Sequence, residues 1–215
     1  EKIKEVFDID QLSKVLALKT LFGAYEFDWK DLKFYYNPIT KLLEPIIREL
    51  HLIHDKNQIV HWWSGRVFDE NCCKDDQDAF LKLLFQNLDF YELYISELNK
   101  FVNNNFIEKL IETNQNEFDE RYKLLKIYYP TNNIFSLDYL ENIKKNIKNI
   151  LNPVQNLNVY FIKEEDQYFY FNVQNLQSLP VKIKQIITND NFKIEFKNEI
   201  KIKGYISKKL PENNI

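Results

Sequence analysis

The chain has 215 residues, of which 45% are hydrophobic and 15% aromatic, enough for one substantial core or two smaller ones. Its formal net charge of −3 gives no basic field for nucleic acid, so we expect no nucleic-acid partner. The 3 glycines are too few for a glycine-rich phosphate loop, and no apolar run has the length of roughly 18–20 residues that a membrane span needs.

The clearest local prediction is a helix near the N-terminus. Its stripe at helical spacing consists of Leu12, Val15, Leu16, Lys19 and Phe22. Asp10 is the expected N-cap, because its carboxylate can accept a hydrogen bond from a free backbone N–H of the first turn. Gly23 has the residue type that commonly follows a last helical turn.

A β-hairpin is predicted next. Residues 32–36 and 42–47 are rich in apolar and aromatic side chains, and residues 37–40, Asn-Pro-Ile-Thr, have the composition of a turn. Residues 51–75 are polar and irregular with embedded aromatics, which predicts a long loop.

Between residues 76 and 152 the pattern indicates one helix after another. The residues expected to begin them are Asp78, Asp89, Asn105 and Ser136. The run that starts at Asn105 either ends near Ile111 or continues through Leu125, and the pattern leaves both open. Asn152-Pro153 ends the last helix, since the residue before proline disfavours helical geometry. The apolar stripes are interpreted as core faces.

After Pro153 the periodicity changes to two, which is typical of strands. The predicted strands are residues 158–162, 167–174 and 181–188, followed by alternating stretches at 192–196 and 200–202. About five strands predict one small antiparallel sheet or half of a sandwich. Its core face is expected to be Phe161, Phe169, Phe171, Phe192, Ile194 and Phe196, leaning on the last helix through Ile143, Ile147 and Ile150. The predicted fold class is α+β, with a mostly helical domain over 1–153 and a small all-β domain over 154–215.

Between Phe7 and Glu49, a helix opening with Phe-Asp is followed by an acidic loop, a strand reading Phe34-Tyr35-Tyr36-Asn37-Pro38, and a second strand that ends near an acidic residue. This motif order resembles the catalytic core of the CotH family of atypical, spore-coat-type protein kinases. Downstream, FLKLLFQNLDFYELYISELNKFVNNNFIEKLI is similar to the helical lobe of that family and SLDYLENIKKNIKNIL to its closing helix. The likeness spans about residues 5–152.

This resemblance implies phosphoryl transfer from ATP to a protein substrate with Mg²⁺. Asp28 takes the place of the catalytic acid of the family, and Asp31 and Glu49 take the places of its two metal ligands. Carboxylates suit Mg²⁺, which neutralises charge on the transferred phosphoryl group, and an Asp can accept the proton of an attacking hydroxyl.

Two of these positions depart from the family pattern. Asp31 stands where an Asn is usual, and Glu49 stands where a shorter Asp is usual. The nucleotide-clamping part that the resemblance places before Phe7 is not in the sequence. A second hypothesis is therefore a non-catalytic surface or secreted scaffold, in which the β domain binds a protein or glycan.

The resemblance also bears on location. The stretch NVQNLQSLPVKI is similar to a β module appended to CotH-like proteins of Bacteroidetes. A secreted, periplasmic or cell-surface protein is the expectation that follows.

The histidines form a separate candidate metal site. All three, His51, His54 and His61, lie within eleven residues of one another. The candidates to complete a zinc shell are Asp55, Cys72 or Cys73, although the spacing matches no recurrent zinc pattern. The alternative interpretation is that these are ordinary loop histidines.

Overall fold

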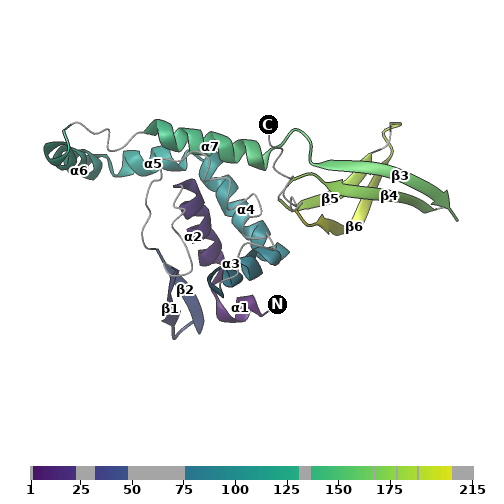
Figure 1. The fold of residues 1–215 in the computed structure, drawn as a ribbon, viewed down its shortest axis with the longest axis horizontal. Coiled ribbons are helices and arrows are strands. Elements are labelled where there is room, and N and C mark those ends of the chain that lie inside the picture. Colours follow the sequence, from purple (N-terminus) through teal and green to yellow (C-terminus); the bar gives the residue numbers. More distant parts are fainter. Residues whose placement is uncertain are drawn as a thin grey trace, which may run out of the picture. The chain divides into compact units, whose positions relative to one another are not determined.

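A computed structural model describes residues 2–22, 32–47, 76–130, 137–166, 168–177, 179–187 and 189–204 (Figure 1). Within these ranges the chain forms seven helices and six strands. The predicted α+β class is therefore confirmed, and the helices precede all but two of the strands.

The elements follow the predicted order closely. The helices are α1 (Ile3–Val6), α2 (Ile9–Leu21), α3 (Asp76–Gln86), α4 (Leu88–Asn103), α5 (Phe106–Thr113), α6 (Gln115–Tyr128) and α7 (Leu137–Leu151). The strands are β1 (Lys33–Asn37), β2 (Leu42–Ile46), β3 (Leu157–Glu165), β4 (Tyr168–Asn175), β5 (Val181–Ile187) and β6 (Lys193–Ile202). The long stretch between β2 and α3 lies outside the described residues.

The described residues form two compact units. The first contains α1, α2, the β1–β2 hairpin and α4 to α7, with the exception of Leu88 at the start of α4. The second contains α3 and the four strands that follow Pro153. One division between the units falls between Asn152 and Pro153.

The helix α2 is capped by a different residue from the one predicted. The Asp8 carboxylate accepts a hydrogen bond from the backbone N–H of Gln11 at 2.9 Å, whereas Asp10 lies inside α2. Asp8 is extended, with φ −70° and ψ 91°, as an N-cap residue should be. Both aspartates have suitable chemistry, and the backbone conformation decides between them.

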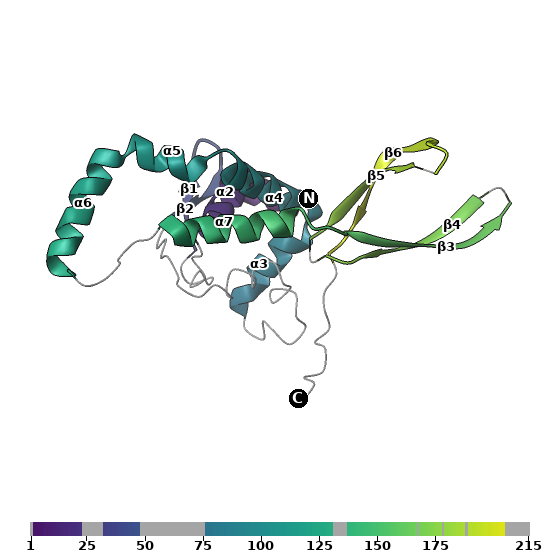
Figure 2. The same cartoon turned by 90° about the horizontal axis from the view of Figure 1, so that it is seen from above.

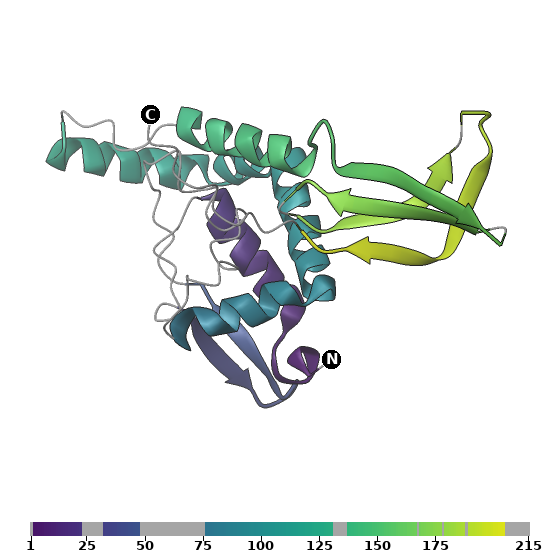
Figure 3. The ribbon, with the colours of Figure 1, turned by 45° about the vertical axis from the view of Figure 1, so that its right-hand side comes forward.

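The core of the first unit is built from α2, α4, α5 and α7. Side chains that are almost completely buried come from each of these helices: Leu12, Leu21, Phe90, Leu98, Ile107, Leu140, Ile143 and Ile147. The helix α2 contacts both β2 and α7 (Figure 3). The Thr20 and Tyr94 hydroxyls, 2.7 Å apart, join α2 to α4 by a buried hydrogen bond. The apolar stripe of α7 thus belongs to this core.

The helix predicted from Asn105 is two helices. Asn114 separates α5 from α6, and its side-chain amide donates to the carbonyl oxygen of Leu110 at 2.7 Å. Asn is a residue type that competes with the helix for backbone hydrogen bonds, and here it ends α5. Of the two alternatives that the pattern left open, the structure selects the earlier end.

The strands after Pro153 do not form the single sheet or half-sandwich that was predicted. They pair as two separate antiparallel hairpins, β3–β4 and β5–β6 (Figure 2). The two alternating stretches at the end of the chain are one strand, β6, whose register with β5 shifts between Ile183 and Gln185. The alternation identified strands correctly, but it carries no information about which strands are neighbours.

The predicted core face of these strands is also wrong. Its six members, Phe161, Phe169, Phe171, Phe192, Ile194 and Phe196, are exposed or half-buried. A two-stranded ribbon has only one neighbour for each strand, so it cannot cover a row of phenylalanines by itself.

The described helices include none that is both long and apolar enough to cross a membrane.

Candidate functional site at the open end of the β1–β2 hairpin

The β1–β2 hairpin is organised by Asn37. The Asn37 side-chain oxygen accepts from the backbone N–H of Ile39 at 2.9 Å, and its amide donates to the Glu44 carboxylate at 2.6 Å. Lys41 closes the turn with φ 60° and donates its backbone N–H to the Asn37 carbonyl at 2.8 Å. The Asn37 side chain therefore stabilises the turn, because its oxygen takes the place of a backbone carbonyl as hydrogen-bond acceptor.

The start of α2 is attached to the hairpin. Phe7 forms a parallel bridge with Leu43, and the Asp8 backbone N–H donates to the Leu43 carbonyl at 3.0 Å. The Phe7 and Phe34 rings lie 5.1 Å apart between centroids. Because the bridge is parallel, the chain that enters α2 runs in the direction of β2, away from the hairpin turn.

The open end of the hairpin is defined by the pair Lys33 and Ile46. These two residues are direct partners across the ladder, at the end opposite the turn. The chain segments that precede Lys33 and follow Ile46 are thus attached side by side. The candidate carboxylates of Asp31 and Glu49 belong to these two segments.

Every predicted site residue lies outside the described part of the chain. This applies to the proposed kinase-type residues Asp28, Asp31 and Glu49, and to the histidines and cysteines, namely His51, His54, His61, Cys72 and Cys73. Within the described ranges, there is no group of three or more His, Cys, Asp or Glu side chains that could hold a metal ion. Both predicted metal sites therefore stay predictions.

A lysine near the end of α2 is buried. Lys19 is 4% exposed, and it has an electrostatic or hydrogen-bonding partner. A buried ammonium group needs such compensation, because removing it from water without a partner is costly. The helical spacing placed Lys19 on the apolar stripe, and this position is confirmed.

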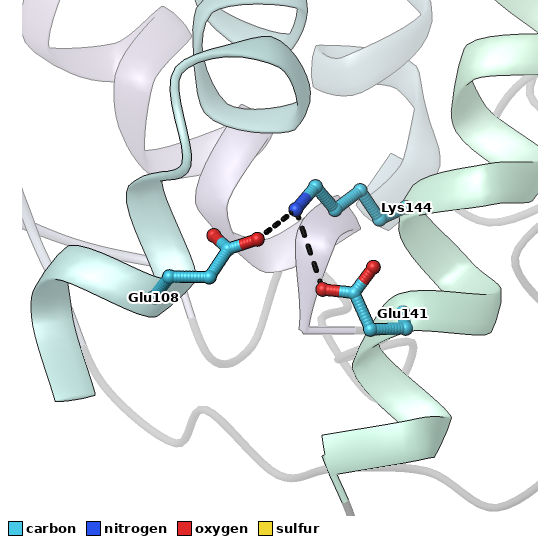
Figure 4. A network of polar contacts seen from close by, with 3 residues as sticks. All are labelled: Glu108, Glu141 and Lys144. Carbon is cyan, nitrogen blue, oxygen red and sulfur yellow. Dashed lines mark hydrogen bonds and ion pairs between the residues drawn. The ribbon is translucent and has the colours of Figure 1, made fainter.

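A second buried lysine joins two helices of the first unit. The Lys144 ammonium group on α7 donates to Glu108 on α5 and to Glu141 on its own helix, the latter at 3.3 Å (Figure 4). The Lys144 side chain is 8% exposed, while Glu108 and Glu141 remain open to solvent. The cluster holds α5 against α7 by charge-assisted hydrogen bonds.

The two sides of this cluster shift each other's titration. The hydrogen bond from Lys144 lowers the pKa of Glu108 below its ordinary value. Burial lowers the pKa of Lys144, but its hydrogen bonds to Glu108 and Glu141 outweigh this effect and leave the pKa raised. Glu108 and Lys144 are therefore both charged at neutral pH.

We expect the Glu108→Gln variant to lose about 1 kcal/mol of unfolding free energy at pH 7, a small value because Glu108 is half exposed. A carboxyl whose pKa is lowered on folding contributes stability above its unfolded pKa and loses it as pH falls through the folded value. The difference between parent and variant should therefore disappear as pH falls below about 4. Urea unfolding at pH 7 and pH 3 measures this.

The matched control is Glu112→Gln on the same helix. Glu112 is exposed and carries the same chemical change without touching Lys144. Equal losses in the two variants at pH 7 would show that the Lys144 cluster contributes nothing specific.

Sequence reasoning missed the Lys144 cluster. The signal was present as Glu141 and Lys144 three residues apart on a predicted helix, a spacing that favours an ion pair. The contribution of Glu108, from another helix, has no sequence signature.

Comparison with known proteins assigns no family and no function to the chain. No family model matches the chain, and neither the curated proteins nor the solved structures contain a match.

Proposed function

We propose that the chain takes part in phosphoryl transfer from ATP to a protein substrate, as its resemblance to CotH-like atypical kinases implies. In this proposal Asp28 is the general base, and Asp31 and Glu49 hold Mg²⁺. The proposal rests on the motif order and on one observation about the described hairpin.

That observation is the pairing of Lys33 with Ile46 at the open end of the hairpin. Asp31 precedes Lys33 by two residues and Glu49 follows Ile46 by three. An extended chain spans about 3.3–3.6 Å per residue, and paired strands lie about 5 Å apart. These lengths allow the two carboxylates to reach one cation in the proposed site.

The charge types fit the chemistry. Mg²⁺ prefers oxygen ligands at about 2.1 Å and retains several waters, so two carboxylates and a nucleotide phosphate are a reasonable shell. Phosphoryl transfer needs mainly positioning and charge neutralisation, and a single Asp suffices to accept the substrate proton. Asp in place of the usual Asn adds a negative charge beside the metal, and Glu in place of Asp lengthens one ligand.

The second candidate function is a non-catalytic surface scaffold. It is supported by the exposed aromatic side chains along β3 and β4, which are typical of surfaces that bind other molecules. In this case the hairpins contact a protein or a glycan, and the kinase-like part has lost its chemistry. Both proposals place the protein outside the cytoplasm, by resemblance.

The test uses calorimetric titration of the full-length protein with ATP and Mg²⁺. Glu49→Asp restores the ligand length usual in the family, so we expect nucleotide binding equal to that of the parent or up to about tenfold tighter. Glu112→Asp, a matched shortening on α5, should leave the affinity unchanged. If neither the parent nor Glu49→Asp binds nucleotide, the phosphoryl-transfer proposal fails and the scaffold remains.

A further inference from the structure

The helix α6 carries an apolar stripe that the described chain does not bury. The stripe consists of Phe118, Tyr122, Leu125 and Tyr129, the last of which directly follows the helix. Spacings of four, three and four residues place these side chains on one face of a helix. Phe118 and Tyr122 are half-buried and stack on each other, with ring centroids 5.9 Å apart, whereas Leu125 is 40% exposed and Tyr129 is 55% exposed.

The helix α6 has little support from the rest of the described chain. None of its side chains is buried, and among the described elements α5 is the one that it contacts to more than a slight extent (Figure 2). An isolated helix of about 12–15 residues is marginal in water, and packing of an apolar face supplies most of the stability of a helix in a protein. Since α6 has 14 residues, a partner on its stripe would stabilise it.

Charged residues are unevenly distributed along α6. The acidic residues all come first and the basic residues all follow, in the order Glu117, Asp119, Glu120, Arg121, Lys123 and Lys126. This order by itself suits the helix dipole. What bears on a partner is that helical spacing places Asp119 and Lys126 along one edge of the stripe, and Arg121 along the other. The Lys126 ammonium group accordingly lies over the ring of Tyr122 in the stripe, 5.2 Å from its centroid.

We propose that α6 binds α6 of a second copy of the chain, with the two helices antiparallel. The stripe is then covered by the same stripe running in the opposite direction. Phe118 faces Tyr129 of the second copy, and Tyr122 faces its Leu125. A two-fold axis forms each of these contacts twice.

Charge selects both the occupant and its direction. In the antiparallel register, Asp119 of each copy lies beside Lys126 of the other, and Arg121 lies beside Tyr128, whose ring can accept a cation. A parallel pair would instead place Arg121 of one copy beside Lys126 of the other, and the like charges oppose it. One sequence therefore supplies both halves of the contact, as a two-fold interface requires.

The proposed contact is short. Four side chains from each copy cover a small area, and interfaces with less than about 1,200 Å² of total buried surface are weak or transient. We therefore expect a dimer dissociation constant on the order of 0.1 mM, which rises as salt is added. Sedimentation equilibrium of the full chain up to about 1 mM measures it.

The described chain has a second exposed apolar surface, on the β3–β4 hairpin. Asn175 at the base of this hairpin is buried, and its side-chain amide donates to the carbonyl oxygen of Lys203 at 3.0 Å. Phe161 and Phe169, nearer the turn, are 59% and 60% exposed. Association through this hairpin would not respond to substitutions in the α6 stripe or at its edges, so variants of α6 separate the two surfaces.

Two charge variants of the full chain test the pairing. Asp119→Lys brings like charges together with Lys126 of the other copy, and Lys126→Asp does the same with Asp119. Attraction becomes repulsion at two places in the dimer, so we expect either variant to raise the dissociation constant at least about tenfold. In a parallel pair, Lys126→Asp would tighten the dimer, because the introduced carboxylate would lie beside Arg121.

Exchanging both charges should restore the dimer. The double variant Asp119→Lys with Lys126→Asp exchanges them within one chain, and an equimolar mixture of the two single variants exchanges them between chains. In both cases opposite charges meet again at each place, so we expect a dissociation constant within about threefold of the parental value. A contact surface outside α6 predicts no such rescue.

Matched controls separate this contact from general effects of charge and of misfolding. Leu125→Ala removes the centre of the stripe and should raise the dissociation constant at least about tenfold, whereas Leu124→Ala, on another face of the helix, should leave it unchanged. Glu120→Lys makes the same change of charge as Asp119→Lys away from the stripe and should also leave it unchanged. Circular dichroism of every variant, recorded in dilute solution, should match the parent.

Three results would overturn the proposal. The first is a parent chain that stays monomeric up to about 1 mM. The second is a dimer that Asp119→Lys and Lys126→Asp leave intact. The third is a failure of the double variant, or of the mixture, to restore the dimer that each single change weakens.

Discussion

Asp28→Asn is expected to slow phosphate transfer to protein by about 10²–10⁴-fold while leaving nucleotide binding within about twofold of the parent. The substitution removes a proton acceptor but keeps the size and polarity of the side chain. General-base catalysis by a positioned carboxylate contributes typically about 10²–10⁴-fold, and the loss should fall in this range. Incorporation of labelled phosphate into protein, measured beside calorimetric ATP binding, gives both quantities.

The control for this variant is Asp10→Asn on α2. Asp10 is exposed and is not the helix cap, so the same Asp to Asn change there should affect neither binding nor transfer. Transfer that persists undiminished in Asp28→Asn would remove Asp28 from the proposed mechanism. Loss of nucleotide binding together with transfer would instead make Asp28 a binding residue.

Leu98→Ala is expected to cause a large loss of stability. Leu98 lies in the middle of α4 with no exposed surface, and its neighbours on the same stripe are also buried. Truncation of a fully buried Leu removes apolar contacts and leaves a cavity, at a cost of about 2–5 kcal/mol. Chemical denaturation monitored by far-UV circular dichroism measures the change.

Leu124→Ala on α6 makes the same chemical change at a side chain that is 56% exposed. We expect a change within about 0.5 kcal/mol there. Similar losses in both variants would mean that the burial of Leu98 does not determine the cost of its truncation, and that α4 is not central to the core.

Helices and hairpins could be predicted from the sequence because their signals are local. Apolar spacing marked α2, α4 and α7, and Asn152-Pro153 marked the end of α7 within a residue. The identity of the α2 cap, Asp8 and not Asp10, could not be predicted from such local signals. It depends on the attachment of Phe7 and Asp8 to β2, which holds Asp8 in the extended conformation of an N-cap.

Strand partnership could not be predicted for a different reason. Alternation fixes which side chains share a face, so Phe161, Phe169 and Phe171 were correctly grouped. It does not say what covers that face, because a strand accepts any neighbour with a suitable edge. For the candidate site, the motif order predicted Asp28, Asp31 and Glu49. The described β1–β2 hairpin adds that the segments carrying Asp31 and Glu49 are attached to it at the same end.

The amide of Asn175 has a consequence for how the second unit is assembled. Each hairpin is closed by contacts between residues near in sequence, so each can form early and alone. The bond from Asn175 to the Lys203 carbonyl spans 28 residues and cannot form until the chain has been synthesised past β6. During translation β3–β4 therefore emerges first, and the Asn175 amide lacks its Lys203 acceptor until β5 and β6 have followed. The β3–β4 ribbon, with Phe161 and Phe169 exposed, is open to association with other chains during that interval.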